Sequence, residues 1–168
     1  PAIIHLKDTC GSFAFDYQSI YSPAGLNPDN TGVIGLDDFD SSWGIWGHNL
    51  RKVLGANTEK VYATINGKAN DSQLCFSSGE MFRLIESYIT DNFGEKGKFR
   101  FVIAPDDTPY ACTCPSCTAI GNTEKNATPA VTELILRLSQ RFPRHFFFTT
   151  SYLTTQQVTD KQLPPNAG

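Results

Sequence analysis

The sequence lacks long hydrophobic runs and any large excess of charge of one sign. No apolar stretch in its 168 residues approaches the roughly 20 residues of a membrane-spanning helix, so we expect no membrane span. The formal net charge is -3, which offers no electrostatic basis for binding nucleic acid or an anionic membrane. The chain begins at Pro1 without a signal peptide, and we interpret it as a processed piece that has lost any export signal.

Glycine-rich phosphate loops are also missing. No Gly-x-Gly-x-x-Gly or Walker sequence follows an expected strand, which argues against a nucleotide site. What the sequence does contain is typical of a globular domain, with 40% hydrophobic and 18% charged residues and enough length for one core. Its 12% of aromatic residues suit either a β-rich core or a cleft that faces carbohydrate.

Expected strands and helices alternate along the chain. Residues 21–40 are expected to form a long loop, and Asn66-Gly67 predicts a tight turn with a returning strand at 73–76. The expected strands are 12–17, 60–65, 99–104 and 145–152; the expected helices end at Gly55, at Gly94 and before Pro143.

Such alternation predicts an α/β fold with a parallel sheet and outer helices. Four βα units are half of a (β/α)8 TIM barrel, which normally needs about 250 residues. A small open parallel α/β sheet is the alternative. We assign residues 1–155 to this βα-repeat domain and residues 156–168 to a linker-like tail.

Two expected helices begin with recognisable capping sequences. Ser77 followed by Glu80 matches a capping box, and Thr128-Pro129 matches an N-cap with Pro at the first helical position. Apolar residues at helical spacing then predict the buried faces. The predicted faces are Met81, Phe82, Ile85 and Ile89 in the first helix, and Val131, Leu134, Ile135, Leu138 and Phe142 in the second.

Acidic residues follow the expected strand 99–104, at the kind of position where α/β proteins carry their chemistry. Asp106 and Asp107 are therefore catalytic candidates, one of them as an acid or as the group that orients the substrate. Adjacent residues on a strand point to opposite faces, so the two are not expected to be the carboxyl pair of a glycosidase. The structural alternative is that one of them caps the loop.

Aromatic and polar residues near the other strand ends are candidates for substrate binding. His48 and Asn49 lie in the first βα loop, Trp46 offers a plane on which a sugar ring can stack, and Tyr152 ends the last expected strand. The structural alternatives are a packed histidine with one satisfied nitrogen and a buried tryptophan.

Five cysteines are present, and the odd number argues against a fully paired disulfide framework. Cys112, Cys114 and Cys117 either bind a soft metal such as zinc with a fourth ligand from elsewhere, or Cys112 and Cys117 form a disulfide, or the thiols stay reduced. Cys75 is expected to be a small buried hydrophobic residue.

Several motifs together carry a family resemblance over roughly residues 13–155. The chain resembles the bacterial domain of unknown function 4838, and the cysteine loop behind the Asp-ended strand is the most specific element. The motifs are Trp43-Gly44-Ile45-Trp46-Gly47-His48, Asn66-Gly67-Lys68, Gln73-Leu74-Cys75, Pro105-Asp106-Asp107, Cys112-x-Cys114-x-x-Cys117 and Tyr152.

The resemblance implies a TIM-barrel glycoside hydrolase, of which this chain is about the first half. Related barrels are the endo-β-N-acetylglucosaminidases of glycoside hydrolase family 163, which act on complex N-glycans, and α-glucuronidases. It therefore implies hydrolysis of glycosidic bonds by the full-length protein, a glycan partner, no required cofactor, and a periplasmic, cell-surface or secreted location. Zinc at the cysteine loop would be structural.

Two further functions remain open. The chain is alternatively a carbohydrate-binding domain without catalysis, or a metal-binding structural domain built on its cysteines. Half a barrel also exposes two sheet edges, which predicts that the chain alone either forms a homodimer that completes the barrel or is poorly soluble.

Overall fold

The computed structural model describes residues 17–20, 22–37 and 42–168. Contacts divide the chain into two compact units, Pro1–Ser41 and Ser42–Gly168. In the first unit the helix α1 (Pro28–Ile34) occupies part of the expected loop, because Asn27 caps its N-terminus and Gly35 closes it at φ 69°. The strand expected at 12–17 lies outside the described residues, except for Tyr17, which is not in a strand.

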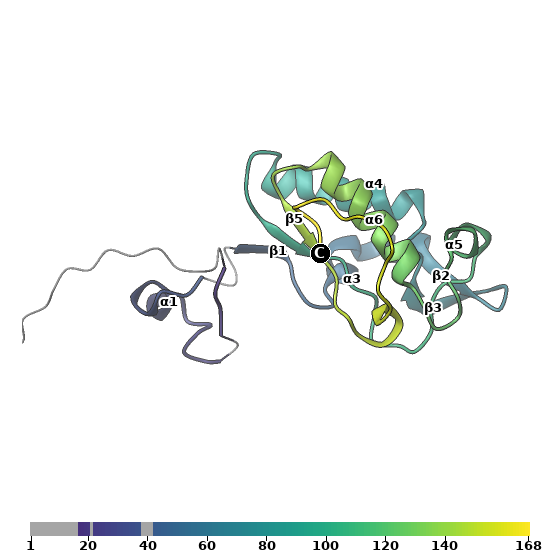
Figure 1. Cartoon of the computed structure of the whole chain (residues 1–168), viewed down its shortest axis with the longest axis horizontal. Coiled ribbons are helices and arrows are strands. Elements are labelled where there is room, and N and C mark those ends of the chain that lie inside the picture. The colour runs from purple at the N-terminus through teal and green to yellow at the C-terminus, as the bar shows by residue number, and fades with distance from the viewer. Residues whose placement is uncertain (1–16, 21, 38–41) are drawn as a thin grey trace, which may run out of the picture. The chain divides into compact units, whose positions relative to one another are not determined.

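The second unit is mixed α/β and is built on a small parallel sheet (Figure 1). Its strands are β1 (Trp43–Ile45), β4 (Arg100–Val102) and β5 (Phe146–Phe148), and β4 lies between the other two. Both pairs are parallel, as the alternation of elements predicts. The observed strands are shorter than expected, and the one expected to reach Tyr152 ends at Phe148.

A second sheet contains only the hairpin of β2 (Tyr62–Ile65) and β3 (Lys68–Leu74), which pair antiparallel. Asn66 and Gly67 join them with φ angles of 52° and 74°, the geometry that the Asn-Gly turn predicts. Counting 60–65 among the parallel strands was therefore wrong, since a two-residue turn makes its strands antiparallel neighbours. The first described parallel strand is instead β1.

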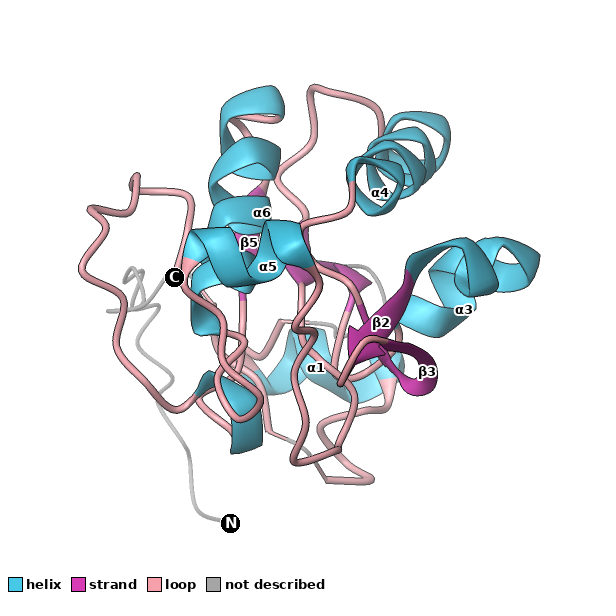
Figure 2. Cartoon of the chain, turned by 90° about the vertical axis from the view of Figure 1, so that its right-hand side faces the viewer, coloured by secondary structure: helices cyan, strands magenta, loops and turns pink. Residues whose placement is uncertain are grey.

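In the described part of Ser42–Gly168, four helices and two short 3-10 helices connect the strands or follow them (Figure 2). No helix among the described residues is both long enough and apolar enough to span a membrane. The elements are α3 (Leu50–Leu54), η1 (Gly55–Val61), α4 (Gly79–Phe93), α5 (Pro115–Ile120), α6 (Thr128–Arg141) and η2 (Leu153–Thr155).

The helix ends test the capping predictions. Gly55 and Gly94 close α3 and α4 as expected. The capping box is wrong, because Ser78 rather than Ser77 caps α4, and Glu80 forms an ion pair with Arg83. Ala127 rather than Thr128 is the N-cap of α6.

The core forms between the sheet and the two long helices. Phe101 of β4 and Phe147 of β5 are paired in register and stack with ring centroids 5.4 Å apart. Phe93 at the end of α4 meets Phe101, and Phe142 beyond α6 meets Phe147. Both helices therefore pack on the same face of the sheet, and the buried residues predicted for them belong to the core, with Phe82 partly buried against it.

The opposite face of the sheet is only half covered. Trp43, Arg100, Phe146 and Phe148 lie on it and are all partly exposed. Trp43 packs against Phe148, and the Arg100 guanidinium lies over the Phe146 ring. The two faces of the sheet thus differ: one is closed by helices and the other is lined by half-buried aromatic residues.

The segment 156–168, expected to be linker-like, is anchored to the domain. The Asn166 side-chain amide donates to the backbone oxygens of Ser139 and His145 at 3.1 and 3.0 Å. Ala167 forms a parallel bridge with Phe147, so the last residues lie along the free edge of β5.

Candidate functional site

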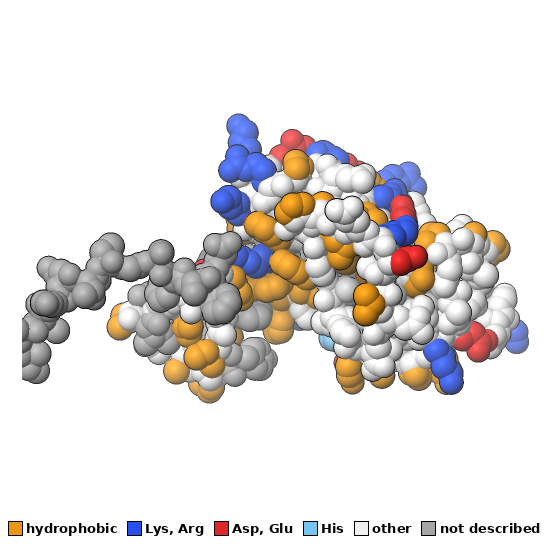
Figure 3. Space-filling model, in the orientation of Figure 1, with side chains coloured by type: hydrophobic (Ala, Val, Ile, Leu, Met, Phe, Trp, Pro, Cys, Tyr) orange, Lys and Arg blue, Asp and Glu red, His pale blue; other side chains and the backbone are white. Residues whose placement is uncertain are grey.

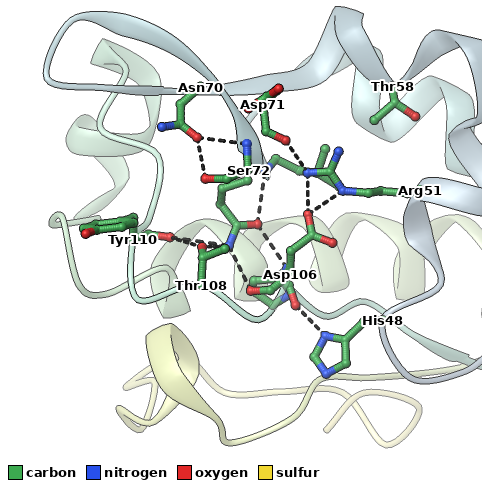
Figure 4. Close-up of polar contacts among 12 residues, drawn as sticks. His48, Arg51, Thr58, Asn70, Asp71, Ser72, Asp106, Thr108 and Tyr110 are labelled. Atoms are coloured by element: carbon green, nitrogen blue, oxygen red, sulfur yellow. Dashed lines mark hydrogen bonds and ion pairs between the residues drawn. The ribbon is translucent and has the colours of Figure 1, made fainter.

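The polar residues at the ends of β1 and β4 are brought together (Figure 4). His48 follows β1, and its Nδ1 lies 2.7 Å from the carbonyl oxygen of Pro105, which follows β4. A carbonyl only accepts, so Nδ1 carries the proton. Nε2 lies 3.2 Å from Oδ1 of Asp107. A hydrogen bond forms between these two atoms when one of them carries a proton.

Asp106 and Asp107 have different surroundings although they are adjacent. Oδ2 of Asp106 accepts a hydrogen bond from Nε of Arg51 at 2.8 Å and forms an ion pair with Nη2 at 2.7 Å. The hydrogen bond to Asp106 is the main reason that the pKa of Arg51 lies above its usual value. The Asp106 side chain is 20% exposed and that of Asp107 is 60% exposed. Asp106 is thus held in an ion pair, and Asp107 is the accessible carboxylate.

A buried glutamine fixes the backbone of this loop. Gln73, near the end of β3, accepts from the Asp106 N–H at 3.1 Å and donates to the Asp106 carbonyl at 3.1 Å. Its side-chain amide also donates to Thr108 Oγ1 at 3.1 Å. The hairpin therefore determines where the chain turns after β4, because one amide bridges the two segments.

Sequence reasoning assigned no role to Arg51 or Gln73. Arg51 lies in α3 while His48 precedes that helix, so helical spacing gave no signal that would group the two. Gln73 belongs to a motif of the family resemblance. Their partners are in segments far away in the sequence, so neither contact can be read from local patterns.

The other predicted substrate-binding residues are placed less tightly. Trp46 follows β1 and is 38% exposed. Asn49 is the N-cap residue of α3 and makes no side-chain capping bond. Tyr152 is 51% exposed and precedes η2, four residues beyond the end of β5. The structure thus brings His48 and Asp107 together, while Trp46 and Tyr152 are exposed aromatic residues.

A second cluster unites four cysteines from separate segments. Cys75 follows β3, and Cys112, Cys114 and Cys117 lie in the loop and helix after β4. Their sulfur atoms all lie within 4.8 Å of one another, and the group could hold a metal ion. Cys75 is the candidate for the fourth ligand expected from elsewhere. It is buried, as the sequence predicted, but its place beside the other three cysteines was not foreseen. All four are free thiols in the structure, so the Cys112–Cys117 disulfide is not formed there.

Proximity makes the cysteines titrate as a group. Hydrogen bonds from Cys117 and Cys75 lower the pKa of Cys112 far below its usual value. The hydrogen bond with Cys112 is also the main cause that raises the pKa of Cys75 and of Cys117. The cluster by itself therefore favours one thiolate, because further negative charges would repel it at this distance.

A separate hollow of the described surface lies away from both clusters. It has a volume of about 240 Å³ and is lined by α6 and the segment that follows β5. Its lining side chains are mainly threonine, glutamine and aliphatic, and none is titratable. It can offer hydroxyl and amide groups to a ligand, but no acid or base.

The fold and these clusters define a mixed α/β domain with a polar strand-end site and a four-cysteine group. The chain belongs to the family described as Domain of unknown function (DUF4838), whose model matches residues 47–166. The match confirms the family, begins later than the expected 13–155 and includes most of the C-terminal segment. No curated protein and no solved structure matches the chain.

Proposed function

We propose that the chain is part of a glycoside-hydrolase-type domain that acts on complex glycans containing hexosamine or uronic acid. The observation that carries this proposal is the accessible Asp107 carboxylate beside His48, at the carboxyl ends of two parallel strands. Glycoside hydrolysis needs carboxyl groups that protonate or orient the substrate, and strand ends are where barrels hold such groups.

The sheet supports the barrel part of the proposal. Its strands follow one another in the order of the chain, and residues 166–168 run parallel to β5 in the place of a next strand. A barrel keeps that order throughout, whereas a doubly wound sheet reverses it at a switch point. The placement of α4 and α6 on one face also suits a barrel, which carries its helices outside.

The surroundings of the two aspartates suggest their roles. Asp107 is the acid or the group that orients a substrate amide, and His48 holds it and shares its proton. Asp106 is a positioning residue, because Arg51 already occupies its carboxylate. The second catalytic carboxylate belongs, in this proposal, to the other half of the barrel.

The surface suits a ligand that is recognised by hydrogen bonds and stacking. On the face drawn in Figure 3, acidic and basic side chains lie near one another and much of the surface is neutral. The exposed Trp46 ring offers a plane for the CH groups of a sugar. Binding without catalysis is the second candidate, and the same exposed residues favour it. A periplasmic, cell-surface or secreted location would give either function access to glycans.

Activity of the full-length protein tests the proposal. We expect it to hydrolyse complex N-glycans, aryl β-N-acetylglucosaminides or aryl α-glucuronides, and Asp107→Asn to lower kcat by about 10²–10⁴-fold. Asp160→Asn, an exposed aspartate outside the site, is the matched control. Glycan binding without turnover in the unmodified protein would contradict hydrolysis and favour the binding domain.

Self-association is a separate part of the proposal. A dimer of this chain in light scattering would agree with two half barrels that complete each other. A stable monomer would favour the small open sheet, since the edge of β5 is already lined by residues 166–168.

A further inference from the structure

We propose that Cys75, Cys112, Cys114 and Cys117 bind one zinc ion as a closed structural site. This inference does not depend on the proposed action on glycans. It concerns how the chain holds the hairpin of β2 and β3 against the loop that follows β4.

The distances between the sulfur atoms fit one tetrahedral ion. Zinc–sulfur bonds of about 2.3 Å place the corners of a tetrahedron about 3.8 Å apart. Sγ of Cys75 lies 3.7 Å from that of Cys114 and 3.8 Å from that of Cys117. All four sulfurs fall within 4.8 Å of one another, so a small contraction of the group completes the tetrahedron. A disulfide would instead need a separation of about 2.05 Å.

Hydrogen-bond donors surround the sulfur atoms as thiolate ligands require. The backbone N–H of Thr64 donates to Sγ of Cys112 at 3.2 Å, and that of Cys117 donates to Sγ of Cys114 at 3.4 Å. The hydroxyl of Ser77 lies 3.0 Å from Sγ of Cys117. Such donors spread the negative charge of metal-bound thiolates and orient them.

The same geometry selects a single ion over a larger cluster. In an iron–sulfur cluster the cysteine thiolates bind different iron atoms, so their sulfur atoms lie farther apart than the corners of a tetrahedron around one ion. Tetrahedral sulfur ligands are typical of zinc, and four protein ligands leave no open position for water or substrate. Cys75, Cys112 and Cys117 are buried and Cys114 is partly exposed, so the site is structural.

The position of the site explains what the ion would stabilise. Cys75 is two residues beyond Gln73, whose side chain holds the backbone of Asp106. Cys112 lies where the loop docks on β2, with the Thr113 N–H donating to the Thr64 carbonyl at 2.7 Å. One ion would thus fasten both ends of the segment 106–117 to the hairpin.

Metal analysis of the purified protein is the first test. We expect about one zinc per chain, and in folded protein the cluster thiols should resist a thiol reagent until the zinc is released. Cobalt in place of zinc should give the intense thiolate charge-transfer absorption of a tetrahedral site. Absence of metal with all cysteines freely reactive, or iron as the bound metal, would overturn the inference. So would two thiols missing from the unfolded protein, which would indicate a disulfide.

Substitutions separate the ligands from their neighbours. Cys75→Ser should lose the zinc or bind cobalt with a weaker charge-transfer band, because one thiolate is gone. Ser116→Ala, an exposed position between two ligands, and Cys10→Ser should keep one zinc per chain. Ser77→Ala should keep the zinc but bind it about 10–100-fold more weakly, as loss of a supporting hydrogen bond predicts. Full zinc affinity in Cys75→Ser would overturn the four-cysteine site, even if that variant is less stable.

Discussion

Nε2 of His48 lies 3.2 Å from Oδ1 of Asp107, while Nδ1 of the same ring is fixed by the Pro105 carbonyl. The carbonyl determines which nitrogen faces the carboxylate, so one shared proton can move between the ring and Asp107. This arrangement is suited to proton transfer, since both groups remain accessible at the strand ends.

Replacing Asp107 should affect function far more than folding. Both side chains of the His48–Asp107 pair are partly exposed, and pairs of this kind contribute only about 0–1 kcal/mol. Asp107→Asn is therefore expected to change the free energy of unfolding by less than about 1 kcal/mol while lowering kcat of the full-length protein by about 10²–10⁴-fold. Urea unfolding measures the first quantity. A loss of several kcal/mol would show that Asp107 is a structural residue.

The Arg51–Asp106 pair should be coupled in stability. Arg51 donates one hydrogen bond to the Asp106 carboxylate, which is also its ion-pair partner, and another to the Asp71 carbonyl, and Asp106 is mostly buried. Charged hydrogen bonds of this kind contribute about 1.5–3 kcal/mol, reduced here by the partial exposure of Arg51. A double-mutant cycle with Arg51→Gln and Asp106→Asn measures the coupling free energy. We expect about 1–2 kcal/mol, and additive single effects would contradict the pair.

Gln73 should be one of the most sensitive polar positions of the domain. Gln73→Ala removes the donor and the acceptor that satisfy the Asp106 backbone and leaves a cavity in a buried place. We expect a loss of about 2–4 kcal/mol in the free energy of unfolding. Gln140→Ala, at an exposed position on α6, is the matched control and should stay within about 0.5 kcal/mol. Equal effects of the two substitutions would contradict the role of Gln73.

Removal of the metal should destabilise the whole domain. A ligand that binds only the folded state stabilises it by about 2.7 kcal/mol when present at 100 times its Kd. A strong chelator should therefore lower the urea midpoint and Tm, and added zinc should restore both. Cys117→Ser should already show the lower stability and no longer respond to chelator. An unchanged midpoint in unmodified protein after chelation would contradict a structural metal.

The sequence by itself determined the local elements and the residues that carry chemistry. Helical spacing predicted the buried faces of α4 and α6, and the Asn-Gly pair predicted the hairpin turn. Cysteine spacing singled out the loop but left a soft-metal site, a disulfide and reduced thiols open. These features depend on neighbours within a few residues, where backbone geometry and side-chain period are sufficient.

Only the tertiary structure decided which of these residues meet. It paired β1 rather than β2 with β4 and brought Cys75 to the cysteine loop. It also placed Arg51 in an ion pair with Asp106, and His48 beside Asp107. Each of these contacts joins segments that are far apart in the sequence. They follow from how the helices cover one face of the sheet and from the need to satisfy buried polar groups, and a local pattern records neither.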